Sequence, residues 1–108
     1  MRYRVLLTDD AVRDLEELEV YIQRHDGPRS AEHVLGKIEE VFLGLEELPE
    51  RGHHPAELAA LGIQEYREVF FKPYRIIYRV QNKTVYVYLS AAGRRDMQDL
   101  LGRRLLRA

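Results

Sequence analysis

The first half of the chain contains two consecutive segments in which apolar residues recur at helical spacing. The first segment, residues 11–26, has an apolar face that consists of Ala11, Leu15, Leu18 and Ile22. The second segment, residues 28–48, has a wider stripe that consists of Ala31, Val34, Leu35, Ile38, Val41, Phe42, Leu45 and Leu48. Gly27 and Pro28 separate the two, since proline is tolerated in the first turn of a helix but not in its interior. The pattern predicts a helical hairpin whose apolar faces are buried against a third element.

In the second half of the chain, apolar and polar residues alternate with the period of a β-strand. Three strands are predicted there, at residues 63–71, 74–80 and 84–90. A fourth strand is predicted near the amino terminus, at residues 3–7. Arginines alternate with apolar residues in the strand at 74–80, yet Ile77 makes both of its faces partly apolar. The sheet is therefore expected to be covered on both sides.

The segments around these elements complete the predicted fold. Thr8 and the two aspartates that follow it are suited to cap the first helix, and Pro49 stops the second. Residues 56–61 are predicted to form one or two helical turns, and residues 96–107 a terminal helix with arginines near its end. The predicted fold is a single α+β domain over residues 1–108. It has an antiparallel sheet, the helical hairpin on one face, and the terminal helix near an edge or on the other face.

The formal net charge of −1 conceals an uneven distribution. Residues 1–65 carry 7 basic and 15 acidic side chains, a balance of −8, whereas residues 66–108 carry 10 basic and 3 acidic, a balance of +7. A basic half attracts nucleic acid or an acidic protein segment through long-range electrostatics. The acidic charge of the two predicted helices is interpreted as a solvated helix surface.

Composition narrows the class of protein. A chain of 108 residues, 45% hydrophobic and 32% charged, forms one ordinary globular domain. The apolar run at residues 1–7 is too short for a signal peptide, and no later segment has the length to span a bilayer, so a cytoplasmic location without a membrane partner is expected. The absence of cysteine excludes disulfides and thiolate metal sites. No phosphate-binding loop or dinucleotide motif occurs, and no cofactor is expected.

The four histidines do not indicate a metal site. His53 and His54 are adjacent in a predicted loop, so their rings cannot easily converge on one ion, and neither has a carboxylate at the spacing of a known site. His25 and His33 lie near helix ends. Solvated or capping roles are expected for these side chains, and no metal is predicted.

Tyrosines crowd the predicted strands, at Tyr66, Tyr74, Tyr78, Tyr86 and Tyr88. One interpretation is strand propensity and cross-strand packing. The other is stacking with the bases of single-stranded RNA beside arginines. Because successive residues of a strand point to opposite faces, packing must account for at least some of them.

The order of these elements resembles the RelE/ParE superfamily, the small toxins of type II toxin–antitoxin pairs. Three motifs carry the resemblance: Arg67-Glu68, the strand Tyr74-Arg75-Ile76-Ile77-Tyr78-Arg79-Val80, and the turn Gly93-Arg94-Arg95-Asp96. It covers nearly the whole chain and implies the same α+β fold. It also implies a separate cognate antitoxin as partner, contact with operator DNA only through that antitoxin, and DNA gyrase or the ribosome as the target.

The two branches of the superfamily differ in chemistry. RelE-type toxins are ribosome-dependent ribonucleases that use lysines on the strand before the Tyr-Arg strand, two arginines, and a late tyrosine to move protons and stabilise the transition state. The two arginines match Arg75 and Arg95, the catalytic candidates if this chain is a nuclease. The lysine-bearing strand contains no lysine before Lys72, and no tyrosine follows Tyr88.

The resemblance therefore favours a ParE-like toxin, which inhibits DNA gyrase by protein contact, over an enzyme. A RelE-like ribosome-dependent mRNA endoribonuclease is the alternative. A third interpretation also stays open, in which the chain only binds its antitoxin and represses transcription together with it.

Basic side chains of the second half are predicted to bind the target or the antitoxin, namely Arg67, Arg75, Arg79, Arg94, Arg95, Arg103 and Arg104. Their planar guanidinium groups suit carboxylate or phosphate. A structural alternative is that Arg67 or Arg75 pairs with Glu68 across the hairpin. The antitoxin is expected to lay an extended or helical segment across apolar grooves and to pair its carboxylates with the basic half.

Overall fold

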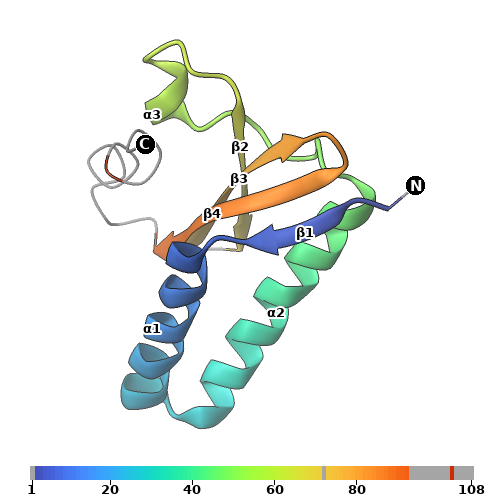
Figure 1. The fold of residues 1–108 in the computed structure, drawn as a ribbon. Helices are drawn as coiled ribbons and strands as arrows, with labels where there is room; N and C mark the ends of the chain where they lie inside the picture. Colours follow the sequence, from blue (N-terminus) through green and yellow to red (C-terminus); the bar gives the residue numbers. More distant parts are fainter. Residues whose placement is uncertain (1, 72, 93–102, 104–108) are drawn as a thin grey trace.

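The computed structural model describes residues 2–71, 73–92 and 103. Within these residues the chain forms two long helices, a short helix and a sheet (Figure 1). The elements are β1 (Arg4–Leu7), α1 (Asp9–Asp26), α2 (Pro28–Glu47), α3 (Ala56–Ala59), β2 (Tyr66–Phe71), β3 (Tyr74–Gln81) and β4 (Thr84–Ala92). The predicted α+β class is confirmed. The predicted terminal helix at residues 96–107 lies outside the described residues except for Arg103.

The four strands among the described residues form one sheet in the order β1-β4-β3-β2. β2 and β3 are antiparallel, as are β3 and β4, which agrees with the prediction. β1 departs from the expected antiparallel arrangement, because it pairs with β4 in parallel, with Arg4 opposite Thr84. Hairpin neighbours must be antiparallel, whereas strands joined by a long connection are free to be parallel. Asn82 has a φ of 57° in the turn between β3 and β4, a conformation that tight hairpin turns require and asparagine tolerates.

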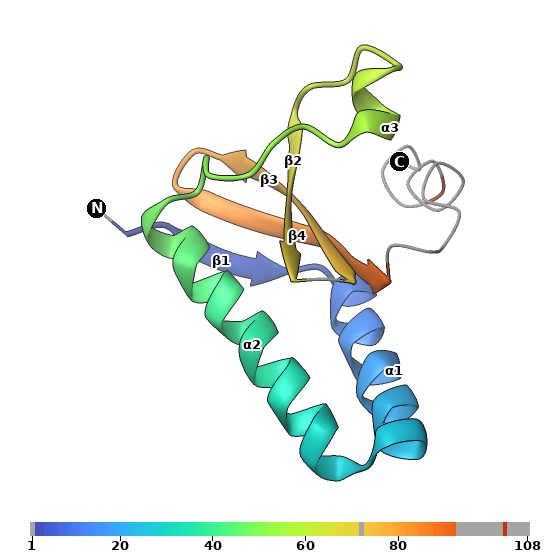
Figure 2. The same ribbon diagram turned by 180° about the vertical axis from the view of Figure 1, so that it is seen from behind.

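The helical hairpin follows the predicted start and turn signals. Thr8 caps α1, since its Oγ1 accepts a hydrogen bond from the N–H of Ala11 at 3.2 Å. Gly27 has a φ of 94°, which is open to glycine, and Pro28 then begins α2 directly. Figures 1 and 2 show that the hairpin contacts the sheet at one end and projects beyond it, with the turn between its helices at the far end.

The core lies between this hairpin and one face of the sheet. Its buried centre consists of Ala11, Ile38, Leu45, Ile76, Tyr78, Val85 and Val87. The apolar faces predicted for both helices are thus confirmed, because Ala11 of α1 and Ile38 and Leu45 of α2 are buried in this core. Leu48, predicted to continue the second stripe, is instead 63% exposed, because α2 ends at Glu47 and Leu48 is its cap.

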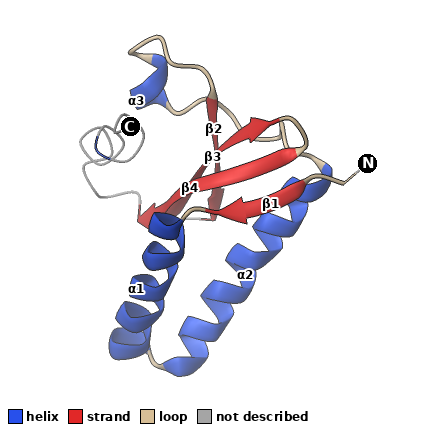
Figure 3. Ribbon diagram, in the orientation of Figure 1, coloured by secondary structure: helices blue, strands red, loops and turns tan. Residues whose placement is uncertain are grey.

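The connection between α2 and β2 contains α3 and otherwise runs as loop (Figure 3). In both ribbon views α3 lies beyond the sheet, at the end away from the turn of the helical hairpin (Figures 1 and 2). Among the helices of the described residues, none combines the length and the apolar character that crossing a bilayer requires.

Candidate functional site

The loop between α2 and β2 is held to the sheet by hydrogen bonds. His53 and Glu68 exchange two backbone hydrogen bonds, of 3.1 and 2.7 Å. The N–H of Gly52 donates to the hydroxyl of Tyr78 at 3.1 Å. Nη1 of Arg67 donates to the carbonyl oxygen of Gly52 at 2.8 Å. These contacts fasten the loop to β2 and β3, through an isolated β-bridge at His53 and Glu68 and through the side chains of Tyr78 and Arg67.

Gly52 and Tyr78 meet in the buried part of this contact. A β-carbon on Gly52 would lie 2.5 Å from the carbonyl oxygen of Glu68 and 2.7 Å from the Tyr78 hydroxyl, so only glycine fits. The Tyr78 side chain is buried, and burial raises the pKa of its hydroxyl. Tyr78 is therefore a structural residue that keeps its proton.

Arg75 lies at the centre of a partly buried charged cluster. Its Nη1 and Nη2 donate to the two carboxylate oxygens of Glu57, and its Nε donates to Oε2 of Glu68, each at 2.8 Å. The side chains of Arg75 and Glu68 are only 12% and 4% exposed. Hydrogen bonding from Arg75 lowers the pKa of Glu57, and hydrogen bonding to Glu57 raises the pKa of Arg75 above its ordinary value. All three guanidinium nitrogens thus have partners within the chain.

His53 extends this cluster, whereas His54 turns away from it. Nε2 of His53 is 3.6 Å from Oε1 of Glu68, and the His53 ring stacks on Phe70 with centroids 5.3 Å apart. Nδ1 of His54 hydrogen-bonds with the carbonyl oxygen of Tyr66 at 3.1 Å. The two rings diverge, although the carboxylate beside His53 was not foreseen. In the described part of the chain, no group of three or more His, Cys, Asp or Glu side chains is arranged to hold a metal.

Arg79 has aromatic surroundings instead. Its guanidinium carbon lies 5.9 Å from the ring centroid of Tyr66, the residue directly opposite it on β2. The Tyr66 ring in turn meets the ring of Tyr88 edge-on, with centroids 5.5 Å apart and planes at 83°. No carboxylate among the described residues pairs with Arg79. Within the residues that the structure describes, the ring of Tyr66 is therefore the recorded partner of the Arg79 guanidinium.

The structure therefore separates the predicted binding arginines. The structural alternative is confirmed for Arg75, which pairs with Glu68 across the β2–β3 hairpin. Arg67 bonds carbonyl oxygens of the loop instead. Arg103 is exposed. The remaining candidates lie outside the described residues, namely Arg94, Arg95 and Arg104.

Glu57 is the residue that the sequence analysis missed. It lies on α3, 18 residues before Arg75, and approaches it only because the loop folds back over the hairpin. A carboxylate in a short helical segment gives no local sign of such a contact. The nearest signal is the excess of arginines on the strands, which requires carboxylates from elsewhere when those arginines are buried.

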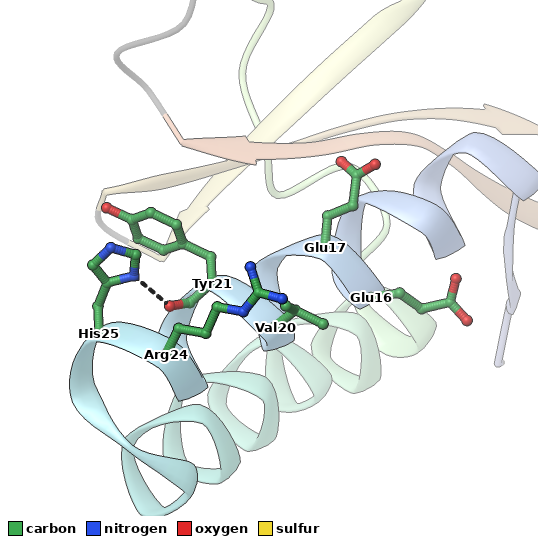
Figure 4. Close-up of a pocket in the computed structure, with 6 residues that line it drawn as sticks. All are labelled: Glu16, Glu17, Val20, Tyr21, Arg24 and His25. Carbon is green, nitrogen blue, oxygen red and sulfur yellow. Dashed lines mark hydrogen bonds between the residues drawn. The ribbon is translucent and has the colours of Figure 1, made fainter.

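A surface pocket lies elsewhere, on the outer side of α1 (Figure 4). It is lined by Glu16, Glu17, Val20, Tyr21, Arg24 and His25. Val20 and Tyr21 are 47% and 55% exposed, with the carboxylates toward one end and the basic side chains toward the other. His25 hydrogen-bonds through Nδ1 to the carbonyl oxygen of Tyr21 at 2.8 Å and stacks on its ring. Exposed apolar surface of this kind is typical of protein contact.

The fold is a helical hairpin packed on a sheet, with Arg67, Arg75 and Arg79 on β2 and β3, and this is the architecture expected of the RelE/ParE superfamily of toxins. Residues 5–98 match the family described as the ParE toxin of the type II toxin–antitoxin system parDE, so the chain belongs to the ParE toxin family. The family predicted from the sequence is thereby confirmed.

Solved structures of toxin–antitoxin systems have a similar fold. The chromosomal ParDE toxin–antitoxin system from P. aeruginosa superposes with a TM-score of 0.71 at 19% identity, over 84% of this chain and 96% of that chain. The toxin–antitoxin complex RelBE2 from Mycobacterium tuberculosis superposes with a TM-score of 0.59 at 26% identity, over 85% of this chain and 92% of that chain. No curated protein matches the sequence. The chain is a type II toxin of the ParE/RelE kind.

Proposed function

We propose that this chain inhibits DNA gyrase by protein contact and is neutralised by a cognate antitoxin. We favour gyrase inhibition over mRNA cleavage because the side chain of Arg75 is already bonded to two carboxylates of the same chain. A ribonuclease needs arginine donors aimed at the charge that develops on the phosphate. Here those donors lie 2.8 Å from the carboxylates of Glu57 and Glu68, which would also repel a phosphate.

The groups needed for proton transfer are also missing from the sequence. β2 carries no lysine, and no tyrosine follows Tyr88. Arginine does not replace them, because its very high pKa makes it a poor acid or base near neutral pH. Inhibition by protein contact needs none of these groups.

Two observations support an antitoxin as the partner, namely the family of the chain and the exposed apolar side chains of α1. Both similar structures described above come from toxin–antitoxin systems. Val12, Val20 and Tyr21 on α1 are exposed and offer apolar contact to a partner segment. In this proposal Arg67 and Arg75 shape the site by holding the loop, while Arg79, Arg94, Arg95, Arg103 and Arg104 contact the antitoxin or the target. The complex acts in the cytoplasm and reaches operator DNA only through the antitoxin.

Two assays on the purified toxin test the proposal. We expect inhibition of gyrase supercoiling and no codon-positioned cleavage of mRNA on ribosomes. Arg75→Ala and Arg95→Ala are compared with Arg29→Ala, an exposed arginine at the start of α2. Ribosomal cleavage that depends on Arg75 and Arg95 would overturn the assignment. If expression arrests growth but the toxin neither inhibits gyrase nor cleaves mRNA, the proposed target is wrong. If growth arrest is absent as well, the chain is better explained as one that only binds its antitoxin.

A further inference from the structure

The register of the sheet aligns one side chain from each described strand in a row across it. Leu6 on β1 pairs with Tyr86 on β4, Tyr86 pairs with Arg79 on β3, and Arg79 pairs with Tyr66 on β2. Their neighbours along the strands, such as Val85, belong to the core under the helical hairpin. Since successive side chains alternate between faces, the row lies on the face away from the hairpin.

This row is accessible, and the guanidinium group of Arg79 in it is held in position by an aromatic ring. Leu6 is 39% exposed, and Tyr86 and Arg79 are partly exposed. The guanidinium of Arg79 rests over the Tyr66 ring at 5.9 Å. A guanidinium held on an aromatic ring keeps its planar donors and loses little further freedom when they bind a carboxylate.

The charges on this face favour an acidic occupant. Arg4, two residues before Leu6 on β1, is exposed on the same face. Glu68 is the only acidic residue of β2 and β3, and Arg75 already engages it at 2.8 Å. Among the described residues of this face, Arg79 and Arg4 therefore have no acidic side chain paired with them.

The ring of Tyr66, beside Arg79, is not free to stack on a nucleic acid base. Tyr66 is only 9% exposed, with Arg79 over its ring and Tyr88 against it. A base that stacks on a protein needs a free aromatic face. Tyr66 offers none, whereas the donors at the rim of Arg79 remain open to a carboxylate.

We propose that this row binds an extended acidic segment of a partner protein. A carboxylate of the segment pairs with Arg79, and an apolar side chain two residues along packs on Tyr86 and Leu6. Strands lie about 4.8 Å apart, and alternate side chains of an extended chain about 7 Å apart, so a segment that crosses the strands obliquely meets both positions. The inference rests on the proposed function, in which this partner is the antitoxin.

Binding of a defined peptide to the full chain tests this site. The probe is a fluorescein-labelled ten-residue peptide in which glutamate alternates with valine, and its control has glutamine at the two central acidic positions. We expect Arg79→Ala to weaken binding of the acidic probe roughly 10- to 100-fold, the usual effect of losing a charged hydrogen-bonding partner. Arg29→Ala removes the same charge from the distant hairpin and should bind as the wild type does.

A second variant shows whether binding needs the planar donors of the guanidinium or only its positive charge. It also shows whether weaker binding results from misfolding. Arg79→Lys keeps the charge but loses the fork, so it should bind the acidic probe several-fold more weakly than wild type while its unfolding midpoint stays near that of Arg29→Ala. Equal binding by Arg79→Ala and Arg29→Ala would overturn the site. So would a wild type that binds neither peptide or does not distinguish them. A single-stranded RNA ten-mer that binds through Arg79 more tightly than the acidic probe would overturn the choice of occupant. None of these measurements involves gyrase, so each proposal can fail without the other.

Discussion

The ionised form of Glu57 stabilises the folded state. Both of its oxygens accept hydrogen bonds from Arg75, and this lowers its pKa below the ordinary value of 4.5. A group whose pKa is lower in the folded than in the unfolded state adds stability above the unfolded pKa, and this stability is lost as the pH falls through the folded pKa. We expect the free energy of unfolding to decrease between about pH 6 and pH 3, and Glu57→Gln to flatten this decrease.

Urea denaturation at a series of pH values measures this effect. Glu39→Gln is the matched control, because Glu39 is exposed on α2. It should keep the wild-type dependence on pH. A Glu57→Gln profile parallel to that of Glu39→Gln would contradict the role given to the ion pair.

Tyr78 and Gly52 test the other attachment of the loop. Tyr78→Phe removes the acceptor of the Gly52 N–H, and an unpaired buried donor costs about 1–3 kcal/mol. Tyr21→Phe, at an exposed ring, should change the free energy of unfolding by less than about 0.5 kcal/mol. Gly52→Ala should destabilise at least as much as Tyr78→Phe, because the new β-carbon meets backbone that cannot move aside. Equal urea midpoints for Tyr78→Phe and Tyr21→Phe would show that the contact is dispensable.

At the scale of elements, α2 offers a matched pair of apolar residues. Ile38 is 1% exposed in the core, whereas Leu43 on the same helix is 53% exposed. Ile38→Ala is expected to cost about 2–5 kcal/mol because it leaves a cavity. Leu43→Ala is expected to cost less than about 1 kcal/mol, since it removes little buried surface. Similar urea midpoints for the two variants would mean that the stripe of α2 faces a partner rather than the core.

These elements were predictable to different degrees. The helical hairpin follows from apolar spacing and from Gly27-Pro28, which are local signals. The two antiparallel hairpins follow from alternation and short turns. The parallel pairing of β1 with β4 joins Arg4 to Thr84, 80 positions apart, and no local pattern encodes it. All the other elements lie between β1 and β4 in the chain, so their pairing depends on how those elements pack.

At the scale of the whole molecule, the uneven charge predicts how partners approach. The balance of −8 in residues 1–65 and +7 in residues 66–108 gives the chain a basic half that favours the approach of an acidic partner. We expect the association rate of toxin and antitoxin to fall as salt rises, because the screening length is about 10 Å at 0.1 M salt. Stopped-flow mixing across a series of salt concentrations measures this rate. A rate that does not respond to salt would exclude electrostatic steering.

The sequence alone determined the α+β class, the helical hairpin, the strand order along the chain and the family, because periodicity, turn residues and motif order are written in neighbouring positions. It also offered, as a structural alternative, that Arg67 or Arg75 pairs with Glu68 across one hairpin, and the structure shows the pair with Arg75. The tertiary structure decided the rest. Glu57 reaches Arg75 through a loop, and Leu6, Tyr86, Arg79 and Tyr66 align through the register of separate strands. Contacts between distant segments depend on how packed elements meet, and this is a property of the folded chain rather than of any stretch of sequence.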